Sequence, residues 1–116
     1  MAAEKLDEAF LWDMLEAAKS TSEFVAEKTV ADYLANKLLR SAVERQIEIV
    51  GEAARQISAA FQKQHPEIPW KLIVAQRHVL AHDYGEIDHE RIWRVAATHI
   101  PDLISLLDPL VPPAPT

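Results

Sequence analysis

The side chains best suited to chemistry lie together in one short segment, Arg77-His78-Val79-Leu80-Ala81-His82-Asp83-Tyr84. This segment holds a permanent cation, two imidazoles, a carboxylate and a phenol within about two turns of a helix. The apolar residues between them can hold the segment against a core while the polar side chains face outward. We therefore expect a functional site on a helix near this segment.

Arg77 and His82 are suited to phosphoryl transfer without a metal. Histidine titrates near neutral pH and can move a proton, and guanidinium stays charged and binds phosphate oxygens with a fork of donors. In RNA the 2′-hydroxyl is a built-in nucleophile, which an imidazole can deprotonate while a guanidinium stabilises the crowded phosphorane. An acid must also protonate the leaving oxygen. One copy of the segment supplies few groups for this chemistry, whereas two copies across a twofold axis supply enough.

Two other interpretations of the segment stay open at this point. His78 and His82 are four residues apart, as in a pair of metal ligands on one helix face, but the glutamate of the His-Glu-x-x-His motif is absent. An arginine and a histidine near a helix end also occur as a surface cation and a cap of the last carbonyls. At 100° per residue, Arg77 and His82 lie about 140° apart around a helix axis. Both line one site only if the helix ends near His82 or the arginine reaches across.

Composition restricts the class of protein. The 116 residues fit one domain, and 49% hydrophobic residues with only two glycines favour a globular, helical chain. The absence of cysteine rules out a disulfide framework or a thiolate site, and we predict neither a metal nor another cofactor. A formal charge of −6 argues against a protein that coats nucleic acid, so phosphate binding needs a local cationic cleft. No segment resembles a membrane span or a secretory leader, and we expect a cytoplasmic protein without membrane contact.

Apolar periodicity predicts an all-α, up-and-down bundle of four to five helices. The expected helices cover about residues 5–27, 30–64, 70–82 and 88–100, with a kink or a short new helix after Pro101. Thr29 and Asp88 are expected N-caps of the helices that follow them. We predict one domain over residues 1–108 and a disordered tail over residues 109–116, which contain four prolines.

The predicted helix over residues 30–64 is the longest periodic run and contains two unusual features. Gly51 lies in its middle, at a cost of about 1 kcal/mol relative to alanine, and close approach of another backbone is one reason for it. Glu44, Glu48 and Glu52 form an acidic row that arginines of the same helix can neutralise. A solvated face is the default interpretation of this row, and a contact with basic groups of a partner is the alternative.

The motif Arg77-x4-His82-x-Tyr84 resembles the Arg-x4-His-x-Tyr motif of the HepT-like toxins, members of the HEPN superfamily of helical ribonucleases. The resemblance extends to residues 42–45, 48–54 and 69–70, and to Trp93 and Pro101. It covers about residues 6–108 in one register, and the block in the long helix makes it more specific than the short motif alone. Many members have asparagine after the motif arginine, whereas this chain has His78, which can hydrogen-bond and can also titrate.

The resemblance implies a homodimer with a HEPN-like fold, in which two Arg77–His82 sites face each other in one cleft. It also implies metal-independent cleavage of RNA that leaves a 2′,3′-cyclic phosphate, with transfer RNA as one candidate substrate. His78 and Asp83 would be supporting polar groups. Such toxins are paired with a small nucleotidyltransferase antitoxin of the MNT type, which can adenylylate the motif tyrosine, here Tyr84. The added nucleotide would place bulk and negative charge where the substrate phosphate must lie.

An alternative function belongs to a different class. The chain would then be a catalytically silent helical dimer that binds the nucleotidyltransferase. His78 in place of asparagine and the acidic net charge both keep this alternative open. It predicts tight partner binding and normal growth when the chain is expressed alone.

Overall fold

The computed structural model describes residues 2–82 and 87–112, and these residues form helices with no strand among them. The elements in chain order are α1 (Ala2–Val25), α2 (Val30–Ala35), α3 (Lys37–Gln56), α4 (Ala59–Gln64), α5 (Trp70–His82), α6 (His89–Arg94), the π-helical η2 (Val95–His99), α7 (Ile100–Leu107) and the 3-10 helix η3 (Asp108–Leu110). The all-α fold class predicted from the sequence is confirmed.

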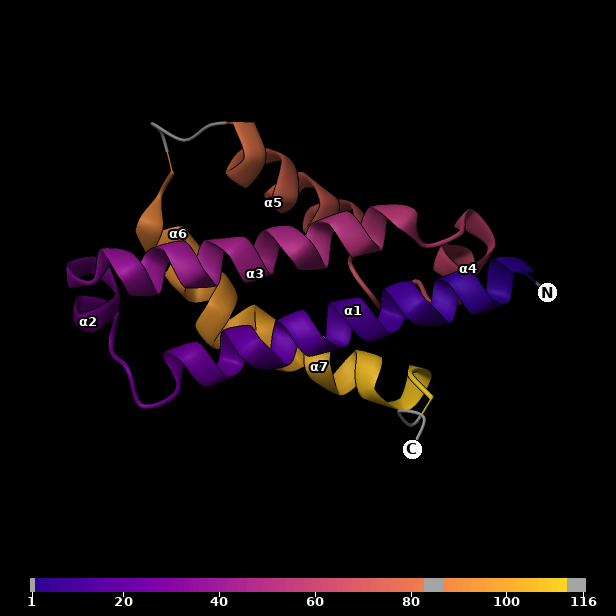
Figure 1. Ribbon diagram of the computed structural model, residues 1–116, viewed down its shortest axis with the longest axis horizontal. Helices are drawn as coiled ribbons and strands as arrows, with labels where there is room; N and C mark the ends of the chain where they lie inside the picture. The colour runs from indigo at the N-terminus through magenta and orange to yellow at the C-terminus, as the bar shows by residue number, and fades with distance from the viewer. Residues whose placement is uncertain (1, 83–86, 113–116) are drawn as a thin grey trace.

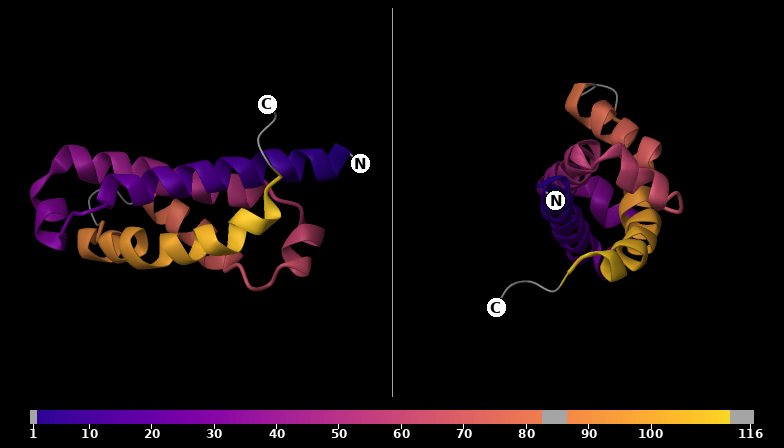
Figure 2. Two further views of the ribbon diagram at one scale, coloured as in Figure 1. Left: turned by 90° about the horizontal axis from the view of Figure 1, so that it is seen from below. Right: turned by 90° about the vertical axis from the view of Figure 1, so that its right-hand side faces the viewer.

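The long helices α1, α3 and α5 and the continuous rod from α6 to α7 alternate in direction along the chain (Figure 1). α1 packs along α3 and also contacts α7, whereas α5 packs mainly against α3. Seen end-on, α5 lies at the outer edge of the bundle (Figure 2). One side of α5 is therefore fixed by α3 while much of its remaining surface is accessible. The structure describes one protomer, so the homodimer stays a prediction.

The prediction of one helix over residues 30–64 is wrong, because the run is divided into α2, α3 and α4. The first break is at Asn36, whose backbone is extended with φ −119° and ψ 98°. The Asn36 side-chain oxygen accepts a hydrogen bond from the Leu39 N–H at 3.0 Å and caps α3. Asparagine favours such a cap because its side chain replaces a missing backbone acceptor.

The second break, after Ile57, is fixed by a contact from α1. The Ser58 hydroxyl caps α4 by accepting from the Phe61 N–H at 3.2 Å. The carboxylate of Asp7 accepts two further hydrogen bonds, from the Ser58 N–H at 2.8 Å and from its hydroxyl at 2.6 Å. Asp7 is buried, and both of its carboxylate oxygens are used. The apolar spacing continues through this break, and so periodicity alone does not reveal it.

Other expected helix boundaries are confirmed by local hydrogen bonds. Thr29 and Asp32 form a reciprocal capping box at the start of α2. Asp88 caps α6 by accepting from the Arg91 N–H at 3.2 Å. The rod passes Pro101 without ending, because Val95–His99 form a π-helical turn in which the Ile100 N–H donates to the Val95 carbonyl. A wider turn there accommodates the missing proline N–H.

The buried apolar residues form two clusters. The first fills the space between α1, α3, α5 and α7, and its larger members are Leu11, Met14, Leu15, Val50, Ile57, Ile68, Trp70, Ile100, Leu103 and Leu107. The second lies toward α2 and α6 and contains Val25, Tyr33, Val43, Ile47, Leu80, Ile92 and Ala96. α5 contributes to both clusters, through Trp70 at its start and Leu80 near its end.

The described part of the chain continues past residue 108, the expected end of the domain, to residue 112. η3 includes Pro109 and Leu110, and both Leu110 and Val111 pack, half-buried, on the first cluster. Residues 113–116 of the predicted tail lie outside the described part of the chain. Among the described helices, none combines the length and the apolar character that a membrane crossing needs.

Candidate active site

α5 is held at both ends, which fixes the position of the polar residues along it. Pro69 precedes its first residue, in keeping with the tolerance of proline at helix starts. The Trp70 indole N–H donates to the His65 carbonyl at 3.0 Å, and the ring packs edge-on against Phe61. Leu80 is 3% exposed in the second cluster. Arg77 lies between these two anchors.

The side-chain stem of Arg77 lies directly on the backbone of α3 at Gly51. A Cβ atom at position 51 would come within 2.1 Å of the Arg77 Cβ and 2.9 Å of its Cγ. It would also lie 3.0 Å from the Ile73 carbonyl oxygen. Glycine therefore permits the close approach of α3 and α5 at the position of the candidate catalytic arginine, as the mid-helix position of Gly51 suggested.

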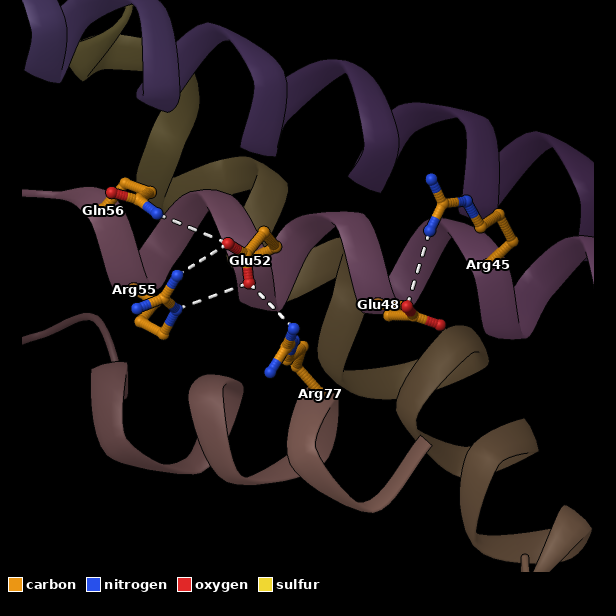
Figure 3. A network of polar contacts seen from close by, with 6 residues as sticks. All are labelled: Arg45, Glu48, Glu52, Arg55, Gln56 and Arg77. Atoms are coloured by element: carbon orange, nitrogen blue, oxygen red, sulfur yellow. Dashed lines mark hydrogen bonds and ion pairs between the residues drawn. The ribbon is translucent and has the colours of Figure 1, made fainter. Parts of the chain in front are cut away.

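The guanidinium of Arg77 forms an ion pair with Glu52, the residue after this glycine. Arg77 Nη2 lies 3.1 Å from Glu52 Oε2, and the Arg77 side chain is 28% exposed (Figure 3). The Arg77 Nε atom is buried and has no hydrogen-bond partner among the described residues. The guanidinium is thus anchored on one edge and still accessible to solvent.

The Glu52 carboxylate is the centre of a small polar network on α3. Arg55 donates to it from Nη2 at 2.8 Å and from Nε at 3.4 Å, and the Gln56 amide donates at 3.3 Å. These hydrogen bonds, those from Arg55 first and from Gln56 second, and the charge of Arg77 lower the pKa of Glu52 below its ordinary value. Glu52 therefore stays ionised, and its charge is shared between two arginines.

Arg77 lines a hollow of about 520 Å³ between α1, α3 and α5. Its walls carry both charges and apolar groups, from Phe10, Asp13, Arg45, Glu48, Ile49, Glu52, Ala53, Gln56 and Arg77. Arg45 pairs with Glu48 at 3.4 Å, one turn before the Glu52–Arg55 pair. Two members of the acidic row of α3, Glu48 and Glu52, are therefore paired with arginines of the same helix, as the sequence suggested, whereas Glu44 pairs with His89 at 3.6 Å.

The other predicted site residues are only partly described. His78 is exposed on α5, and His82 is the last residue of that helix, although its side chain lies outside the described part of the structure. Asp83 and Tyr84 also lie outside the described residues. Position 82 lies about 140° around the α5 axis from position 77. Within the described residues, the geometry of the site is therefore given by Arg77 and its contacts.

A second groove, of about 630 Å³, lies on the opposite flank of α5, toward η2 and α7. Leu72 and Val79 form part of its apolar wall, and Arg91 and Arg94 are on its lining. These two arginines lie on the flank of α5 away from the hollow that contains Arg77.

Sequence reasoning missed Glu52 as the partner of Arg77. It placed Glu52 in an acidic row and expected arginines of its own helix, or basic groups of a partner, to neutralise that row. The signal that could have found the pair was Gly51, because close approach at residue 51 brings the neighbouring residue 52 against the same helix.

The model of the family described as Ribonuclease HepT-like matches residues 14–110 of this chain. The chain belongs to this family. The family resemblance inferred from the Arg77, His82 and Tyr84 motif is confirmed. The matched region contains all of α5 together with Gly51 and Glu52.

Relatives of this HepT-like chain are named as ribonucleases. It is 38% identical over 95 residues to "Putative RNase MJ1380" of Methanocaldococcus jannaschii, covering 82% of this chain and 87% of the relative. It is 37% identical over 94 residues to "Probable ribonuclease HepT" of Thermococcus cleftensis, covering 81% and 86%. No solved structure gave a significant match.

Proposed function

We propose that this HepT-like protein is a metal-independent endoribonuclease toxin of a toxin–antitoxin pair. In this proposal Arg77 and His82 of two protomers form a composite site that cleaves RNA and leaves a 2′,3′-cyclic phosphate. A nucleotidyltransferase antitoxin neutralises the toxin by adenylylating Tyr84. The observation that carries the proposal is the family match over residues 14–110, which includes the helix with the motif.

The proposed reaction is a transesterification within the RNA. The 2′-hydroxyl oxygen attacks the neighbouring phosphorus while His82 removes its proton, and the bond from phosphorus to the 5′-oxygen breaks. The 5′-oxygen leaves with a proton from an acid, for which the histidine of the second protomer is available. Arg77 stabilises the charge that builds on the phosphorane oxygens. His78 and Asp83 would support these groups through hydrogen bonds.

The geometry of α5 supports a composite site. Arg77 is turned toward α3 and Glu52, whereas position 82 is about 140° further around the helix axis. An arginine and a histidine that diverge on one helix can converge when a second copy of the helix faces the first. The accessible surface of α5 at the edge of the bundle leaves room for such a partner (Figure 2).

The nuclease proposal is tested with purified parent, Arg77→Ala and His82→Ala proteins, matched for folding and for oligomeric state. We expect both variants to lose at least about 100-fold in RNA cleavage, because each removes a group that acts on the transition state. Lys19→Ala and His99→Ala are controls, since they remove an exposed cation and an exposed histidine outside the hollow that contains Arg77. Cleavage by the parent should persist in a chelator and leave 2′,3′-cyclic ends. Unchanged cleavage by both variants would show that the assignment is wrong.

The antitoxin part of the proposal is tested at Tyr84. Incubation with the nucleotidyltransferase and ATP should add one AMP moiety to the parent and abolish cleavage. Tyr84→Phe should still cut RNA but resist silencing. If the Tyr84→Phe protein also gains the mass of one AMP moiety and loses RNA cleavage to the same extent as the parent, another residue is the target.

A second candidate function is the silent dimer that binds the nucleotidyltransferase. The observation that favours it is the pairing of Arg77 with Glu52, which offsets part of the cationic charge that an RNA phosphate needs. Induction of the chain alone discriminates between the two functions. Growth arrest that disappears with His82→Ala supports the toxin, and normal growth with intact RNA supports the binding protein.

A further inference from the structure

Glu52 is the described residue that contacts the Arg77 guanidinium through an ion pair. Its carboxylate is itself fixed, since Arg55 donates to both of its oxygens and Gln56 donates to Oε1 (Figure 3). All three of these residues lie on α3. The carboxylate is therefore held in place by its own helix before Arg77 of α5 reaches it.

The stem of Arg77 is held as closely as its head. Its Cβ and Cγ lie over Gly51, where even one added carbon at residue 51 would overlap them. A long, flexible side chain loses much of its freedom when both its stem and its charged end are fixed. An arginine held in this way does not have to be ordered again when a substrate phosphate arrives.

The charges of the network leave Arg77 competent to bind an anion. Two guanidinium groups share the single Glu52 carboxylate, so the three groups together keep a net positive charge. A guanidinium has five N–H donors, and the contact with Glu52 uses Nη2. The side chain also remains partly exposed at the hollow between α1, α3 and α5.

We propose that Glu52 is a positioning residue for RNA cleavage, which orients the Arg77 guanidinium toward the scissile phosphate. This inference rests on the proposed role of Arg77 in the nuclease. Glu52 does not contact the substrate, and Arg55 contributes by holding Glu52. The pair of Gly51 and Glu52 on α3 thus sets the position of the reactive cation on α5.

The test compares Glu52→Gln and Glu52→Ala with Glu44→Gln as the matched control. Glu44 is two turns earlier on α3 and has its own ion pair, with His89 at 3.6 Å, but it lies outside the hollow that contains Arg77. We expect Glu52→Ala to lower kcat for RNA by about 10- to 100-fold with a smaller change in KM, because the cation is present but misplaced. Glu52→Gln keeps an acceptor oxygen and should lose less. Glu44→Gln should cut like the parent.

A double-variant comparison separates positioning from a loss of stability. In an Arg77→Lys background, where the guanidinium is absent, Glu52→Ala should cause little further loss of kcat. Equal losses from Glu52→Ala in both backgrounds would overturn the positioning role. The inference alone also fails if Arg77→Ala is inactive while folded Glu52→Ala retains parental kcat. If Arg77→Ala cleaves RNA like the parent, the proposed function fails and the inference fails with it.

Discussion

Arg77 of α5 lies so close to Gly51 of α3 that a methyl group at residue 51 would meet the Arg77 Cβ at 2.1 Å. The neighbouring Glu52 then pairs with the guanidinium at 3.1 Å. Two consecutive residues of α3 therefore fix both ends of the candidate catalytic side chain. Their effects can be separated experimentally, because Gly51 acts by leaving room for the Arg77 side chain and Glu52 acts through its charge.

Gly51→Ala should destabilise the protein although alanine is the better helix former. The propensity gain is about 1 kcal/mol, whereas overpacking against α5 costs about 1 to 3 kcal/mol and the facing Cβ cannot rotate away. The difference predicts a net loss of up to about 2 kcal/mol in the free energy of unfolding, measured with urea. Ser41→Ala, at an exposed position of α3, is the control and should not destabilise. If Arg77→Gly does not relieve the effect of Gly51→Ala, the clash lies elsewhere.

Glu52→Gln should lower stability more at neutral pH than in acid. The pKa of Glu52 is lowered in the folded state by Arg55, Gln56 and Arg77, so the unfolded chain binds more protons as the solution is acidified. The stabilisation is therefore present above the ordinary carboxyl value of 4.5 and is lost as the pH falls below it. Because the side chain is well exposed, we expect about 1 kcal/mol or less. Urea unfolding at both pH values measures the difference, and a gap that widens in acid contradicts the prediction.

Tyr33→Phe should leave stability unchanged or raise it by up to about 1 kcal/mol. The Tyr33 ring is fully buried and packs against Trp93 with 5.6 Å between ring centroids. Its hydroxyl has no hydrogen-bond partner among the described residues, and burial followed by the nearby Glu44 charge raises the pKa of this phenol. Tyr33→Leu is the comparison, and it should destabilise because the ring contacts are lost. A loss above about 1 kcal/mol for Tyr33→Phe would indicate that the hydroxyl is paired in solution.

Asp7→Ala should destabilise the junction between α3 and α4. Both hydrogen bonds from Ser58 to the buried carboxylate are lost, which costs about 2 kcal/mol in the free energy of unfolding. Hydrogen exchange of the Phe61 amide should also become faster, since the Ser58 cap loses its support. Glu8→Ala changes an exposed neighbouring carboxylate and should have little effect. Equal stability of the two variants would contradict the role of Asp7.

The helix boundaries that the sequence predicted well depend on neighbouring residues. Thr29 and Asp88 each cap a helix through the backbone N–H three residues further along the chain, so residue type and position suffice to find them. The break at Ser58 was missed because the carboxylate that fixes it comes from Asp7, which is 51 residues away. Nothing in the local apolar spacing reports such a contact.

The sequence by itself determined the all-α class, the family, and the location of Arg77 and His82 on one helix, because these follow from motif spacing and from local periodicity. Only the tertiary structure decided which way Arg77 points and which carboxylate holds it. The reason is physical: Glu52 and Arg77 are 25 positions apart in the chain and meet because Gly51 lets two helices approach within contact distance. Side-chain identity supplies the reactive groups, and the packing of α3 against α5 sets the geometry of Arg77.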